Sequence, residues 1–110
     1  MRLEIVEYET AGARSPFGQW FAKLDPVAAA KVVVAISRMA QGNPGNVRSL
    51  GEGISECRID TGPGYRVYFG RDGAILMVLL AGGTKARQQR DIDTARKYWK
   101  DYKQRRTALR

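Results

Sequence analysis

The stretch AILMVLLAG at residues 74–82 restricts the possible folds most, because both faces of any strand it forms are apolar. A strand of that kind lies in the middle of a sheet and is covered on both sides. The run is far too short to span a bilayer, since a helical span needs about 20 apolar residues. It ends abruptly at Gly82-Gly83-Thr84-Lys85. These residues therefore predict a central strand that leads directly to a lysine.

Three other segments, residues 2–8, 54–60 and 65–70, show the alternation of strands. Asp72-Gly73 is a hairpin turn signal between residues 65–70 and the central strand. The last three strands therefore form a meander, and the first strand pairs at the edge or in the centre of the sheet.

Two helices are predicted between the first and second strands. Ser15 is a plausible N-cap with Pro16 at the first helical position, and Asp25-Pro26 repeats this start signal. Gly42 is the expected stop of the second helix. The simplest arrangement of the two helices is an antiparallel hairpin.

A third helix is predicted over residues 88–106, with an apolar stripe of Ile92, Ala95, Trp99 and Tyr102. The predicted class is α+β, in the order β-α-α-β-β-β-α. It has a small, twisted, mostly antiparallel four-stranded sheet, an N-terminal helical hairpin and a basic C-terminal helix. We expect residues 1–110 to form one domain, with helices on one face of the sheet and the other face open.

The composition excludes several kinds of site. The chain has no histidine and a single cysteine, Cys57. Triads that use histidine, histidine acid–base catalysis, zinc sites and an intramolecular disulfide are therefore excluded, and neither a metal nor another cofactor is expected. Charged residues interrupt residues 1–9, so no signal peptide is visible, and a cytoplasmic location without a membrane partner is expected.

Positive charge is concentrated at the C-terminal end. Residues 85–110 hold ten Lys or Arg against three Asp, whereas residues 1–84 hold nine against eight acidic residues. Such a basic segment attracts polyanions, with nucleic acid as the leading candidate. The alternative is a solvated helix that its lysines keep soluble.

Arg66 interrupts a hydrophobic strand and lies on the same face as Tyr68. One interpretation is a cross-strand ion pair with Asp60 or Glu56, which contributes less than about 1 kcal/mol if exposed. The other is a donor fork fixed on a rigid strand and directed at a phosphate. Whether Arg58 shares this face depends on the length of the turn before Arg66.

Lys85 follows paired glycines, which allow the backbone to turn sharply or to approach a ligand closely. The alternative is an ordinary exposed lysine. The spacing of a phosphate-binding P-loop is absent. Since Arg66 and Lys85 lie on adjacent predicted strands, the sequence allows them to converge on one anionic ligand.

The segments GISECRID, GPGYRVYF and LLAGGTKARQQRDIDTA resemble the RelE/ParE superfamily of toxins from bacterial type II toxin–antitoxin modules, most closely its HigB-like, phage Gp49-like branch. The resemblance implies a small antiparallel sheet with a basic concave surface. It also implies cleavage of messenger RNA in the ribosomal A site and a cognate helix-turn-helix antitoxin as partner.

The resemblance also implies roles for single residues. Arg66 matches the arginine that contacts the scissile phosphate, Lys85 a basic position at the end of the last strand, and Arg58 a residue that binds the RNA backbone. Asp91 falls near the place where some members carry a catalytic tyrosine or histidine. This chain has no histidine and no tyrosine at that position, so the proton donor or acceptor is Lys85, Tyr68, Asp91 or another group, or the ribosome supplies it.

The sequence thus predicts a ribosome-dependent mRNA endonuclease, which needs no metal because the RNA 2′-hydroxyl is the nucleophile. The alternatives are a ParE-like DNA gyrase poison and a non-toxic basic RNA-binding remnant. The predicted RNA-binding residues are Arg58 and, in the basic C-terminal segment, Arg87, Arg90 and Lys97. Phe17, Trp20 and Phe21 in the helical hairpin form either an antitoxin docking site or part of the core.

Overall fold

The computed structural model describes residues 2–43 and 45–108. Its elements are β1 (Glu4–Glu7), α1 (Pro16–Ala22), α2 (Pro26–Ala40), β2 (Val47–Gly51), β3 (Ile54–Ile59), β4 (Tyr65–Asp72), β5 (Leu76–Thr84), the 3-10 helix η1 (Lys85–Arg87) and α3 (Gln88–Ala108). The predicted α+β class is confirmed. None of the helices in the described part of the chain is long and apolar enough to cross a membrane.

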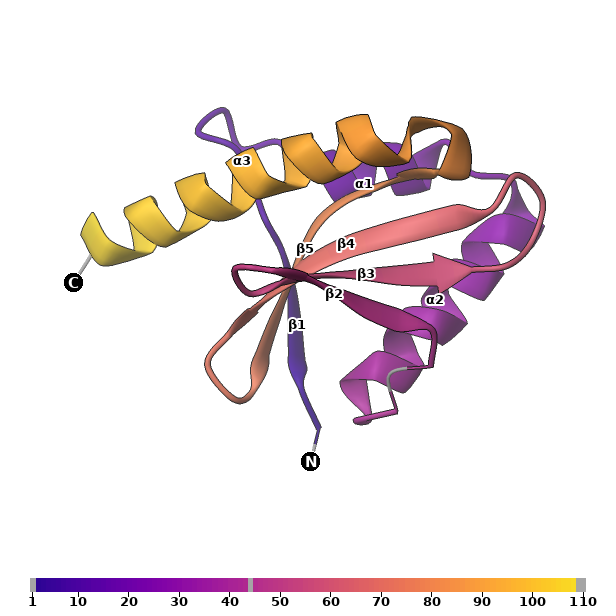
Figure 1. Cartoon of the computed structure of the whole chain (residues 1–110), viewed down its shortest axis with the longest axis horizontal. Helices are drawn as coiled ribbons and strands as arrows, with labels where there is room; N and C mark the ends of the chain where they lie inside the picture. The colour runs from indigo at the N-terminus through magenta and orange to yellow at the C-terminus, as the bar shows by residue number, and fades with distance from the viewer. Residues whose placement is uncertain (1, 44, 109–110) are drawn as a thin grey trace.

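The sheet has the strand order β1-β5-β4-β3-β2 (Figure 1). β1 lies at one edge and runs parallel to β5, while the other three pairs are antiparallel. The sequence predicts four strands, and β2, at the other edge, is the fifth. The sequence pattern misses β2 because this short edge strand has no buried residue.

The predicted helix caps are confirmed. Ser15 Oγ accepts a hydrogen bond of 2.9 Å from the Gly18 N–H at the start of α1. Asp25 Oδ1 accepts two hydrogen bonds, each of 3.0 Å, from the N–H groups of Val27 and Ala28 at the start of α2. Both side chains satisfy donors that have no partner within the helix, so the hairpin begins where the sequence indicates.

Helices cover both faces of the sheet, so the expectation of one open face is wrong. α1 and α2 pack on the face that carries Val67 and Phe69. α3 packs across the opposite face, where Trp99 lies in one cluster with Tyr68 and Leu80 (Figure 1). The physical reason is that the apolar stripe of α3 needs a partner surface and β5 is apolar on both faces.

The aromatic residues of α1 belong to the core. Phe17 is buried, and Trp20 and Phe21 are partly buried against the same cluster. The Trp20 ring lies over Gly82 so closely that a Cβ at Gly82 would collide with it. Core packing therefore accounts for these three aromatic side chains.

Candidate nucleic-acid interface

The direction of Arg66 decides which residues can share a site with it. Val67 and Phe69 face the core beneath α1 and α2, so Arg66 and Tyr68 face the side that carries α3. The pairing of β3 with β4 places Arg58 directly opposite Arg66. The two arginines therefore share one face of the sheet, which the sequence alone does not decide.

A cavity of about 420 Å³ opens on this face, beside the start of α3. Arg66, of which 6% is exposed, forms its buried wall, and the exposed residues Arg48 and Arg58 lie at the same cavity. Three guanidinium groups thus come together from three neighbouring strands. The lining residues are Gly45, Asn46, Val47, Arg48, Glu56, Arg58, Arg66 and Gln88.

Glu56 connects the walls of this cavity. Its carboxylate, only 1% exposed, accepts hydrogen bonds from Gln88 Nε2 at 2.9 Å and from Arg48 Nη2 at 3.3 Å. Arg66 Nε lies 3.7 Å from Glu56 Oε2, which is an ion pair but too long for a hydrogen bond. The predicted cross-strand pair with Glu56 is thus present. One carboxylate among three guanidinium groups leaves the cavity positive, as an anion site requires.

The Arg66 guanidinium can still donate hydrogen bonds despite this ion pair. Its Nε is buried and has no hydrogen-bond partner among the residues that the structure describes. A buried donor without a partner is costly, and such groups are concentrated at functional sites. A phosphate oxygen in the cavity would satisfy the guanidinium.

Tyr68 lies deeper than the cavity. Its side chain is fully buried, and its hydroxyl lies close to the Glu56 carboxylate. Burial raises the pKa of Tyr68, and the nearby charges of Glu56 and Asp91 raise it further. The phenol is therefore neutral at physiological pH and does not line the cavity.

Asp91, in the first turn of α3, lies directly over Gly83 in β5. A Cβ at Gly83 would collide with the Asp91 carboxylate. Because Gly83 is the pairing partner of Arg66, Asp91 lies on the Arg66 side of the sheet. Burial raises the pKa of Asp91, while Arg87 and Arg90 oppose this shift. The protonated carboxyl is thus more favourable here than in water, which suits a proton donor.

Asp91 is not among the residues that line the cavity, and the remaining predicted residues also lie outside it. Lys85 is exposed at the end of β5, and its backbone N–H donates a 2.9 Å hydrogen bond to Gly64 O. Arg87 and Arg90 are exposed near Asp91, and Lys97 is exposed further along α3. The structure therefore brings Arg58 and Arg66 together and places Lys85 apart from their cavity.

Sequence reasoning did not place Arg48 or Gln88 in the site. Arg48 lies in β2, whose two partly buried residues, Val47 and Leu50, are three positions apart, so no alternating pattern in the sequence marks this strand or its arginine. Gln88 is the first residue of α3, and only the packing of the helix brings its amide to Glu56. No sequence signal marks that contact.

Comparisons with known proteins identify the family of this chain. Residues 19–100 match the family described as phage derived protein Gp49-like (DUF891), which is associated with RelE-like toxins. An uncharacterized protein of Haemophilus influenzae is 43% identical over 81 residues, which make up 73% of this chain and 82% of the relative. Because the family match extends over most of the sequence, this chain belongs to the phage-derived Gp49-like family.

Proposed function

We propose that this chain is the toxin of a type II toxin–antitoxin module and acts as a ribosome-dependent mRNA endonuclease. The association of its family with RelE-like toxins supports the first part. The observation that supports the second part is the buried Arg66 guanidinium at the wall of a positively charged cavity. A guanidinium on a central strand is preorganised to donate to two oxygens of a phosphate.

In the proposed reaction, the RNA 2′-hydroxyl attacks the adjacent phosphorus and the bond to the next nucleotide's 5′-oxygen breaks. The products are a 2′,3′-cyclic phosphate and a free 5′-hydroxyl. Arg66 stabilises the charge that grows on the phosphate, and Arg58 binds the neighbouring backbone. One preorganised contact of this kind typically raises the reaction rate about 10²–10³-fold.

The reaction moves two protons, one from the 2′-hydroxyl to a base and one to the departing 5′-oxygen. The proposal assigns the second to Asp91, whose carboxyl lies on the Arg66 side of the sheet and whose pKa is raised by burial. Tyr68 supports the site from the core, and Lys85 adds a positive charge at the end of β5. The ribosome supplies the base.

The exposed cations of η1 and α3 have a separate role in this proposal. Arg87, Arg90 and Lys97 bind ribosomal RNA through its phosphates, so this attraction does not depend on sequence. The activity places the chain in the cytoplasm, with a helix-turn-helix antitoxin as the neutralising partner.

The test is primer extension on cellular mRNA after brief induction of the chain. We expect codon-associated cleavage with the wild type and none with Arg66→Ala. Arg71→Ala is the matched control, since it removes an exposed arginine from the same strand. Intact transcripts with gyrase-dependent DNA breaks would identify a gyrase poison instead, and normal growth under induction would identify a non-toxic remnant.

A further inference from the structure

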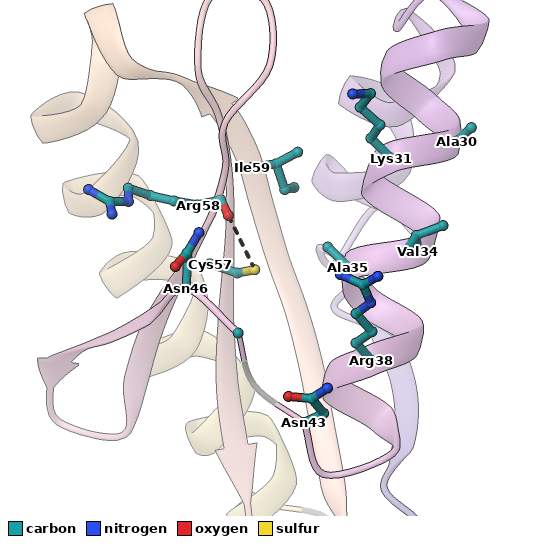
Figure 2. Close-up of a pocket in the computed structure, with 11 residues that line it drawn as sticks. Ala30, Lys31, Val34, Ala35, Arg38, Asn43, Asn46, Cys57, Arg58 and Ile59 are labelled. Carbon is teal, nitrogen blue, oxygen red and sulfur yellow. Dashed lines mark hydrogen bonds between the residues drawn. The ribbon is translucent and has the colours of Figure 1, made fainter.

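A second cavity, of about 400 Å³, lies between α2 and β3, on the face of the sheet that carries the hairpin (Figure 2). Cys57 and Ile59 of β3 form one wall, and Ala35 of α2 lies across from them (Figure 2). We call this cavity the α2–β3 groove. Its lining residues are Ala30, Lys31, Val34, Ala35, Arg38, Asn43, Gly45, Asn46, Cys57, Arg58 and Ile59.

The outer side of α2 carries an unusual stripe for a surface helix. Val27, Lys31, Val34 and Arg38 follow one another at intervals of four, three and four residues, so they share one side of the helix. Val27 is 66% exposed and Val34 is 49% exposed. The opposite side of α2 fills the core, so the outer side exposes a second set of apolar side chains, which alternate here with cations, and an amphipathic partner could cover both.

Charge in the groove has one sign. Lys31 and Arg38 project from α2 beside the groove, whereas the Arg58 guanidinium points away from α2 on the far side of β3 (Figure 2). None of the described residues that line the groove is acidic. The surface therefore offers two cations beside an apolar floor.

We propose that the α2–β3 groove binds an acidic amphipathic segment of the antitoxin. The identity of this partner rests on the proposed function. Apolar side chains of that segment cover Val34, which is 49% exposed, and its carboxylates pair with Lys31 and Arg38. A second copy of this chain fits poorly, because each copy has a net charge of +8 and the two would repel each other. RNA also fits poorly, because phosphates gain nothing from an apolar floor.

This placement predicts how the partner acts. The groove is on the α2 side of the sheet, and Arg66 faces the α3 side. The bound segment therefore does not compete with a phosphate for Arg66. It neutralises the toxin by adding bulk that keeps the chain out of the ribosome.

The experiment measures binding of the purified protein encoded by the reading frame adjacent to this one, by calorimetry. We expect Lys31→Glu with Arg38→Glu to weaken binding about a hundredfold, since each new carboxylate faces a like charge. The control, Arg71→Glu with Lys100→Glu, makes the same charge change away from the groove. It is expected to change the affinity less than about threefold, because salt screens distant charges. Thermal melts verify that each variant folds.

Four outcomes overturn the inference, and they are distinguishable. If the wild type does not bind the neighbouring protein, the partner in the proposed function is wrong. If the wild type binds and the groove variant binds equally well, only the groove assignment fails, and equal weakening by the control shows unspecific attraction. If the groove variant loses affinity for an RNA oligonucleotide but keeps the protein partner, the groove binds nucleic acid.

Discussion

Glu56 and Arg66 show at the scale of single residues how this chain keeps charge inside its fold. Both side chains are almost fully buried, and burying charge is costly unless it is paired. Glu56 meets that condition with hydrogen bonds from Arg48 and Gln88 and an ion pair with Arg66. Arg66 depends on Glu56 alone among the described residues, so its position follows from one carboxylate.

Replacing Glu56 with alanine should therefore destabilise the protein strongly. Glu56→Ala leaves the Arg66 guanidinium buried without a counter-charge, and removing one partner of a buried pair costs about 3–5 kcal/mol. Urea denaturation measures the loss in free energy of unfolding. Asp60→Ala, which removes an exposed carboxylate next to β3, is the control and should change it by less than about 0.5 kcal/mol. Equal stability of the two variants would contradict the role assigned to Glu56.

The partly buried carboxyl of Asp91 predicts that the stability of the protein depends on pH. Burial raises its native-state pKa above the ordinary value of 3.8, so the native state loses stability as pH rises and the carboxyl ionises. Asp91→Asn removes this loss, and we expect a higher Tm than the wild type at neutral pH. The gain should shrink as pH falls through the native pKa and disappear below 3.8. Thermal melts across this range test it, and a gain that is constant with pH would refute the explanation.

At the scale of elements, two neighbouring glycines let helices approach β5 from opposite sides. Trp20 of α1 lies over Gly82, and Asp91 of α3 lies over Gly83. Successive residues of a strand point to opposite faces, so each glycine serves one helix. The paired glycines that suggested a ligand contact from the sequence thus have a packing function.

Gly82→Ala should show the cost of filling this space. The added methyl group collides with the Trp20 ring, and overpacking of a core typically costs about 1–3 kcal/mol. The free energy of unfolding in urea measures this cost. Gly12→Ala is the control, because its nearest contact is an ordinary 3.8 Å to Thr10 Oγ1. If Gly82→Ala is as stable as the control, α1 does not depend on this close approach.

The elements also show what local sequence predicts well. The caps at Ser15 and Asp25 and the apolar stripe of α3 were predicted correctly, because capping and helical periodicity depend on neighbours in the chain. β2 was missed because pairing with β3, and not an apolar pattern, makes it a strand. The face covered by α3 was also mispredicted, although the two apolar faces of residues 74–82 already indicated cover on both sides.

For the whole molecule, the distribution of charge predicts salt-dependent RNA binding. Residues 85–110 carry ten cations against three anions. The logarithm of the affinity for single-stranded RNA should fall linearly with the logarithm of salt concentration, by about 0.7 per phosphate contact. Arg90→Ala and Lys97→Ala should each reduce the slope by about this amount. Fluorescence anisotropy with an RNA oligonucleotide measures the slope, with Arg14→Ala as an exposed control. Unchanged slopes in both α3 variants would show that α3 does not bind RNA.

The sequence by itself determined the α+β class, the helix starts, the position of the central strand and the location of the excess charge. These features depend on residue type and on spacing along the chain. Only the tertiary structure decided that Arg58 and Arg66 share a face, that Lys85 lies outside their cavity and that Arg48 and Gln88 hold Glu56. Strand register and helix packing set these contacts between distant segments, and a shift of one residue in register would reverse which side chains meet.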